Sequence, residues 1–149
     1  MKTSAKIAID SSKEKVWSIV SDIENAAKRI KCIKSLEMIE RPEHGLIGTK
    51  WKETREMFGK EAIETMWIID AKENEFFITE AKNSGCLYHS KVQIHERENG
   101  VELEMTFTAT PESLLAKVMS PLMYLMKGTI KKAFLKDLED IKLSLGNKV

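Results

Sequence analysis

The stretch Thr110–Leu145, TPESLLAKVMSPLMYLMKGTIKKAFLKDLEDIKLSL, decides the fold of this chain. Its apolar residues recur at spacings of three and four, as in an α-helix with one buried side. They are Leu115, Val118, Met119, Leu122, Met126, Ile130, Ala133, Phe134, Leu138, Ile141 and Leu145. We therefore predict one long helix, with Thr110 as its N-cap and Pro111 in its first turn.

The two halves of this predicted helix differ in character. Pro121 lies inside the pattern and Gly128 follows, so we expect a kink or a broken first segment. Residues 114–126 are apolar on nearly every side, whereas the part beyond Gly128 has a narrow stripe typical of an amphipathic cover. Three interpretations of 114–126 stay open: a gate that touches a membrane or partner during ligand entry, a dimer interface, and burial under long loops.

Before this helix the chain reads mostly as strands. Thr3–Asp10 alternates, with apolar residues on one side, and predicts a first strand. Ser11 and Glu14 have the spacing of a capping box and predict a short helix after it. A second short helix, Ile23–Ile30, is expected after Asp22.

Six further strands are expected between the short helices and the long one. Gly59 marks one hairpin turn, and Asn99-Gly100 marks another. Strands joined by such tight turns form an antiparallel sheet. The sequence thus predicts an α+β fold with seven strands and a single domain over residues 1–149. The six strands are Ser35–Arg41, Gly48–Phe58, Lys60–Asp70, Glu75–Ala81, Leu87–Arg97 and Val101–Thr110.

Composition restricts the function. The 149 residues carry a formal net charge of +1 and no basic stripe interleaved with aromatics, which argues against nucleic acid as a partner. Cys32 and Cys86 have no metal-ligand spacing and are expected to be unpaired thiols in a reducing compartment. With neither a signal-peptide pattern nor a membrane span, we expect a cytoplasmic protein.

Three stretches resemble the START/Bet v 1-like (SRPBCC) superfamily, in particular its polyketide cyclase/dehydrase and lipid-transport-like families. The stretch 16–24, VWSIVSDIE, is similar to their opening helix, and 48–55 with 58–61 and 136–138 are similar to later parts of the pattern. The resemblance covers nearly the whole chain. It implies a helix-grip fold, in which a curved sheet wraps around a long C-terminal helix. It also implies an internal cavity for a lipid, sterol, hormone or polyketide, and only some members of the superfamily are enzymes.

The strand Gly48–Phe58 provides the most informative site candidates. The face that carries Trp51 and Met57 is expected to point inward, which also turns Glu53 and Arg55 inward. Buried charges need partners. Glu53, Arg55 and Glu64 could therefore form a polar cluster that orients the polar end of an apolar ligand. Alternatively, the two charges of the strand lie in solvent or in a structural ion pair.

Other residues could line the same cavity. Tyr88 could direct its hydroxyl inward or be an ordinary buried tyrosine, and methionines adapt to varied ligand shapes. His44, His89 and His95 are expected to be exposed, and we predict no metal and no cofactor. The full set of candidate cavity residues is Trp51, Glu53, Arg55, Met57, Glu64, Met66, Tyr88, Met105, Phe107, Met119, Met123 and Met126.

The sequence thus favours binding or transport of a small hydrophobic molecule between the sheet and the C-terminal helix. The chain has no P-loop, GxSxG, HExxH or catalytic Cys–His pattern. Two alternatives stay open. One is a cyclase- or dehydratase-like enzyme using Tyr88, Glu53, Glu64 or Arg55. The other is a co-chaperone-like module that binds proteins. We expect a monomer or a homodimer, with membrane contact through 114–126 as one option.

Overall fold

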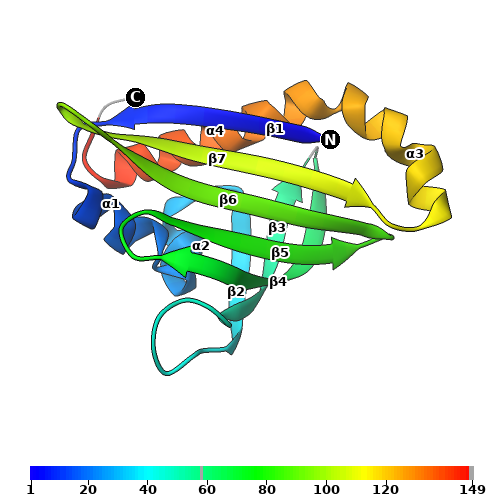
Figure 1. Ribbon diagram of the computed structural model, residues 1–149, viewed down its shortest axis with the longest axis horizontal. Coiled ribbons are helices and arrows are strands. Elements are labelled where there is room, and N and C mark those ends of the chain that lie inside the picture. Colours follow the sequence, from blue (N-terminus) through cyan, green and yellow to red (C-terminus); the bar gives the residue numbers. More distant parts are fainter. Residues whose placement is uncertain (58, 148–149) are drawn as a thin grey trace.

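The computed structural model describes residues 1–57 and 59–147, which form a seven-stranded sheet and a set of helices (Figure 1). The elements in chain order are β1 (Lys2–Ile9), α1 (Lys13–Val20), η1 (Ile23–Asn25), α2 (Ala26–Arg29), β2 (Ile33–Glu40), β3 (Lys50–Met57), β4 (Lys60–Lys72), β5 (Phe76–Asn83), β6 (Cys86–Arg97), β7 (Gly100–Pro111), α3 (Leu114–Leu125) and α4 (Lys127–Ser144). η1 is a single 3₁₀ turn.

The sheet is antiparallel throughout, in the order β1-β7-β6-β5-β4-β3-β2. Its strands follow one another by hairpins from β2 to β7, and β1 then pairs with β7, so that Ala5 lies opposite Met105. Because side chains alternate along a strand, one face of the sheet gathers the apolar residues. We call this the inner face. The predicted fold class, including the two short helical segments after the first strand, is confirmed.

The core lies between the inner face and α4. Leu138, Ile141 and Leu145 are buried and belong to one cluster with Ile9 and Leu103 of β1 and β7. Figure 1 shows α4 running along β1 and β7, on one side of the sheet. The part of the predicted helix beyond Gly128 is therefore the amphipathic cover that its narrow stripe indicated.

Two findings concern the helix predicted over Thr110–Leu145: its predicted start was wrong, and the break expected near Pro121 and Gly128 is confirmed. First, β7 extends to Pro111, and the N-cap is Ser113, whose Oγ accepts a hydrogen bond from the Ala116 amide at 3.1 Å. Pro111 sits there because a residue at a strand end can lack an N–H. Second, the helix breaks at Met126 into α3 and α4. The expected break exists, although Pro121 lies inside α3.

The stripe on α3 is largely exposed. Leu115 is 74% exposed, Val118 67% and Leu122 50%, whereas the stripe on α4 is buried or half-buried. In Figure 1, α3 extends beyond the end of β7 and does not lie over the sheet. Simple burial of 114–126 under loops is therefore wrong. None of the described helices is long and apolar enough to cross a membrane.

Smaller corrections concern the N-terminal helices and the turns. Ser12, one residue later than predicted, caps α1 by accepting from the Lys15 amide at 3.2 Å. The predicted helix Ile23–Ile30 is divided between η1 and α2, and Asp22 does not cap it. Arg97 pairs with Gly100, so the turn consists of residues 98 and 99. Phe58, the predicted end of β3, lies outside the described residues.

Candidate ligand-binding site

An ion-pair cluster joins β3 to α4. The Arg55 guanidinium donates from Nη1 to Oδ2 of Asp137 at 2.7 Å and from Nε to Oε2 of Glu53 at 3.2 Å. The indole N–H of Trp51 reaches the other oxygen of Glu53 at 3.4 Å. The inward orientation expected for Glu53 and Arg55 is thus what the structure contains, and Glu53 is buried.

Asp137 of α4 completes this cluster and Asp140 lies one turn further on, and sequence reasoning missed the role of both. Asp137 accepts from the Cys32 thiol at 3.3 Å, and Asp140 accepts from the Lys31 amide at 3.0 Å and from Lys136 Nζ at 3.1 Å. A signal was present in the sequence. Asp137 follows Phe134 by three positions and precedes Ile141 by four, so it lies on the apolar stripe. A carboxylate on a buried stripe requires a cationic partner.

The charges in the cluster are mutually compensated. Burial alone would lower the pKa of Arg55, but the carboxylates of Asp137 and Glu53 outweigh it and raise that pKa further. Burial also raises the pKa of the Cys32 thiol to about 11, an effect that Arg55 opposes and Asp137 reinforces. Arg55 is therefore always charged but already flanked by two carboxylates. It offers little net positive charge to a ligand.

Glu64, the third member of the predicted cluster, lies beside Glu53 but has a different partner. It is opposite Glu53 in the β3–β4 register, yet its described hydrogen-bond partner is Asn83 Nδ2 at 3.5 Å. Arg55 instead pairs with Glu53 and Asp137. The cluster therefore bridges sheet and helix, and Glu64 is a separate acidic group on the inner face.

Toward the end of the sheet nearest α3, the inner face is incompletely covered. The half-buried side chains there include Met66, Tyr88, Met105 and Phe107. Met66 and Tyr88 lie in one row across the sheet, since both pair with Ala81 of β5. Tyr88 stacks on Phe107 with ring centroids 5.6 Å apart, and Phe107 meets Phe134 of α4 edge-on at the same separation. We call Met66, Tyr88, Met105 and Phe107 the open inner face.

Tyr88 is the polar group among these aromatic and thioether side chains. Burial raises its pKa to about 12, and the neighbouring Cys86 thiol adds to this. At neutral pH the phenol therefore stays protonated and can donate a hydrogen bond, whereas it cannot serve as a base.

The other residues predicted to line the cavity differ in their burial. Trp51 is buried in the core, and Met57 is half-buried near the end of β3. On the helical side, Met123 and Met126 are half-buried, whereas Met119 is 49% exposed. The predicted residues from β3 to β7 thus share the inner face, and the helix methionines do not all turn toward it.

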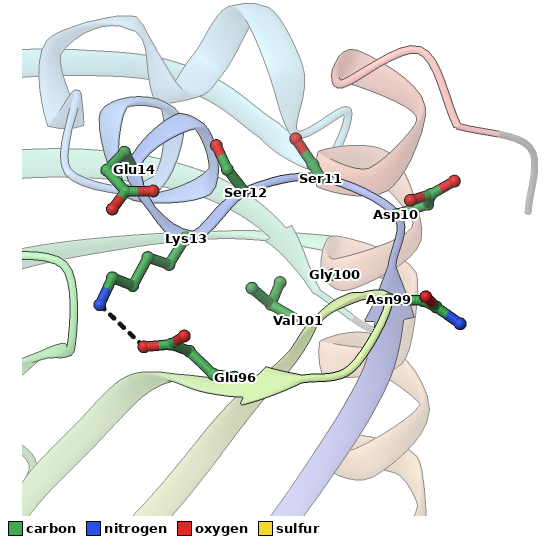
Figure 2. A pocket seen from close by; sticks show the side chains of 9 residues that line it. All are labelled: Asp10, Ser11, Ser12, Lys13, Glu14, Glu96, Asn99, Gly100 and Val101. Atoms are coloured by element: carbon green, nitrogen blue, oxygen red, sulfur yellow. Dashed lines mark hydrogen bonds and ion pairs between the residues drawn. The ribbon is translucent and has the colours of Figure 1, made fainter.

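A hollow of the described surface lies at the opposite end of the molecule. It has a volume of about 660 Å³ and lies between the start of α1 and the β6–β7 hairpin (Figure 2). Its lining is largely polar, and the ion pair of Lys13 with Glu96, at 2.7 Å, crosses one side. Such a lining does not suit an apolar ligand. Within residues 1–57 and 59–147, no three His, Cys, Asp or Glu side chains group as metal ligands would.

Comparison with known proteins places the fold. The sequence matches no protein-family model and no curated protein. Known structures do match. One is a START superfamily protein from Mycobacterium smegmatis, with a TM-score of 0.77 and 18% identity, covering 97% of this chain and 98% of that one. Another is Ara h 8.0201, with a TM-score of 0.64 and 17% identity, covering 99% of each chain.

A third match is the di-domain aromatase/cyclase StfQ from the steffimycin biosynthetic pathway, with a TM-score of 0.78 and 10% identity. It covers 95% of this chain, which spans only half the length of StfQ. These identities establish the fold alone. The chain has the helix-grip fold of START/Bet v 1-like proteins, and the resemblance inferred from its sequence is confirmed at that level.

Proposed function

We propose that the protein binds a small, largely apolar molecule between its sheet and its C-terminal helices. The observation that carries this proposal is the open inner face, whose aromatic and thioether side chains are only partly buried, although Met66 and Met105 also touch the core. Covering such surface is favourable by roughly 25 cal/mol per Å² of apolar area. The folds of the START protein and Ara h 8.0201 are consistent with this use of the inner face.

The polar groups nearby favour a ligand with a neutral polar end. Tyr88 can donate a hydrogen bond from its protonated hydroxyl, and Glu64 can accept one. A carboxylate would instead meet Glu64 and an Arg55 that Glu53 and Asp137 already neutralise. The ligand class that fits is therefore a hydroxyl- or carbonyl-bearing molecule, sterol-like or polyketide-like, rather than a fatty acid.

A cyclase- or dehydratase-like activity is the second candidate, because the StfQ fold hosts an aromatase/cyclase. Tyr88 and Glu64 would be the groups that face the substrate. The raised pKa of Tyr88 restricts it to donating a proton or a hydrogen bond at neutral pH. We rank binding first because it requires only the apolar surface and no base. Mass spectrometry of a bound polyketide before and after incubation distinguishes binding from catalysis, because catalysis changes the mass or the fragmentation spectrum of the polyketide.

The test of binding is titration of the full chain with a fluorescent sterol and a fluorescent fatty acid, together with native mass spectrometry of the purified protein. Met66→Trp adds bulk to the inner face and should weaken sterol binding by about tenfold. Ile63→Trp is the matched control, since Ile63 lies on the same strand but is 57% exposed on the other face. Equal affinities in the two variants, or no binding by the wild type, would overturn the proposal.

A second pair of variants tests the polar end. Tyr88→Phe removes only the hydroxyl and should weaken a hydroxyl- or carbonyl-bearing probe by roughly fivefold, the usual net value of one hydrogen bond. Tyr124→Phe makes the same change on the exposed surface of α3, where Tyr124 is 61% exposed. If the fatty-acid probe binds more tightly than the sterol probe, the neutral ligand class is wrong.

A further inference from the structure

Helix α3 presents an apolar surface that the described part of the chain does not cover. Apart from the half-buried Met123, its large apolar side chains are half to four-fifths exposed, from 49% for Met119 to 81% for Leu125. Only Ala116 of the helix is buried, where it turns toward the end of β7. The exposed members of this surface are Leu114, Leu115, Val118, Met119, Leu122 and Leu125.

These six side chains lie together on one side of the helix. At about 100° per residue they occupy a continuous arc of roughly 140°. Tyr124 and Lys117 follow on one edge of the arc, and the inward-facing Ala116 lies on the other. We call the six residues the α3 apolar face. An arc of this width is typical of an amphipathic helix, and such a helix can lie in a membrane interface with its apolar side submerged.

Along α3 and the first part of α4 the charged side chains have a single sign, although the exposed Glu112 lies directly before Ser113. From Ser113 to Lys136 the sequence contains five lysines, Lys117, Lys127, Lys131, Lys132 and Lys136, and no aspartate or glutamate. Elsewhere the charges are mixed, so that the whole chain has a formal net charge of only +1. The first four lysines are exposed side chains of α3 and the start of α4, and only Lys136 has an ion-pair partner among the described residues.

We propose that α3 docks the protein on an anionic phospholipid surface. The α3 apolar face enters the boundary between headgroups and acyl chains, and the lysines pair with the anionic headgroups. A second copy of the chain is a poorer occupant of this face, because two such surfaces would bring the four exposed lysines of one copy toward those of the other. The proposal concerns a surface separate from the open inner face, so it holds with or without a bound ligand.

The structure explains how α3 can enter a membrane while the rest of the domain stays folded. The helix starts beside the β5–β6 turn, where the amides of Glu112 and Ser113 donate to the Gly85 carbonyl at 2.8 and 3.1 Å. It ends at Met126, where α4 begins in a new direction (Figure 1). Between these two points α3 makes few contacts with the sheet.

The test uses the full chain and two kinds of vesicle, phosphatidylcholine alone and phosphatidylcholine with about 30% phosphatidylserine, in a co-sedimentation assay. The wild type should bind the anionic vesicles at least about tenfold more than the neutral ones. Raising the salt to about 0.5 M should reduce that difference by screening.

Two variants separate the apolar and the charged contributions. Leu115→Glu/Leu125→Glu should reduce anionic binding by at least about tenfold, because both side chains belong to the α3 apolar face. The matched control is Ile47→Glu/Ile63→Glu, with equal charge change at side chains that are 54% and 57% exposed elsewhere. Lys131→Gln/Lys132→Gln should weaken binding by more than about tenfold, and Lys15→Gln/Lys28→Gln, on α1 and α2, should not.

The outcomes decide the proposal. Binding of the control pairs together with loss of binding in the α3 variants supports it, provided that circular dichroism shows all variants folded. Equal binding of neutral and anionic vesicles overturns the role of the lysines. Absence of vesicle binding by the wild type overturns the proposal that α3 docks on a membrane. If the wild type is then a dimer in solution and Leu115→Glu/Leu125→Glu dissociates it, the α3 apolar face binds a second copy of the chain.

Discussion

Arg55 on β3 and Asp137 on α4 form an ion pair of 2.7 Å across 82 positions of sequence. The Asp137 side chain is 1% exposed and that of Arg55 17%. The C-terminal helix is thus held to the far half of the sheet by a charged contact, while its apolar stripe packs near β1. The stability of the contact between β3 and α4 therefore depends on the guanidinium of Arg55.

The Arg55–Asp137 pair should be costly to break on one side. Asp137→Ala leaves the guanidinium with Glu53 alone, and Arg55→Ala leaves Asp137 buried without its cation. Each should lower the free energy of unfolding by about 3 kcal/mol, as measured by urea denaturation. The control is Lys34→Ala, because the 3.0 Å pair of Lys34 with Glu56 is half exposed and should contribute less than about 1 kcal/mol. Similar losses in the three variants would contradict this reading of the cluster.

The stability of the protein should fall in alkali partly through Cys32. Its pKa is raised from the ordinary value of 9.0 to about 11, chiefly by burial. Below pH 9 the thiol is protonated in both the folded and the unfolded chain. Between pH 9 and 11 the unfolded chain loses the proton first, so the free energy of unfolding decreases as the pH rises. Cys32→Ala should flatten this decrease in urea titrations from pH 8 to 11. An unchanged slope would show that the thiol does not contribute.

Gly85 should tolerate no side chain. A Cβ at this position would overlap Ser113 Oγ, the atom that caps α3, and lie 2.7 Å from Ser113 Cβ, and Gly85 also has a φ of +75°. Gly45→Ala is the matched control, since Gly45 has a φ of +72° but open space around it. The control should cost about 1 kcal/mol from backbone strain alone, and Gly85→Ala at least about 1 kcal/mol more. Equal losses in urea denaturation would mean that Ser113 moves away freely.

The two C-terminal helices should differ sharply in their contribution to stability. Leu138→Ala removes a side chain of α4 with 0% exposure and should cost about 3 kcal/mol. Leu122→Ala makes the same truncation on α3, where Leu122 is 50% exposed, and should cost less than about 1 kcal/mol. A large loss for Leu122→Ala in thermal or urea denaturation would mean that α3 packs against the domain in solution.

The repeating patterns of the sequence were sufficient to predict the strands of the sheet and the helix α4. Alternation in the strands and the stripe around Leu138 both report burial on one side, and that burial is what the structure contains. The same stripe misled on α3, because Leu115 and Val118 repeat at helical spacing without being buried. Periodicity identifies a helix and its apolar side, but it does not identify what covers that side.

The site was predictable only in part, for a different reason. The inward direction of Glu53 and Arg55 follows from alternation along β3. Their partner did not follow, because Asp137 is distant in sequence and only the packing of α4 brings it to Arg55. Likewise the sequence predicts Thr110 as the N-cap of α3, whereas the structure uses Ser113, which offers the same capping chemistry three residues later. Several good caps in one stretch leave the choice to tertiary contacts.

The position of β1 has a consequence for how the chain folds as it is synthesised. β1 is made first, yet it lies at the edge of the sheet and pairs with β7, whose residues follow it by about a hundred positions. During translation the backbone of β1 therefore stays unpaired until β7 has left the ribosome. The hairpins from β2 to β6 can form earlier, since each strand pairs with the next. Closure of β1 onto β7, followed by docking of α4, is thus the last step open to a nascent chain, and truncation before Gly100 would leave the first strand without its partner.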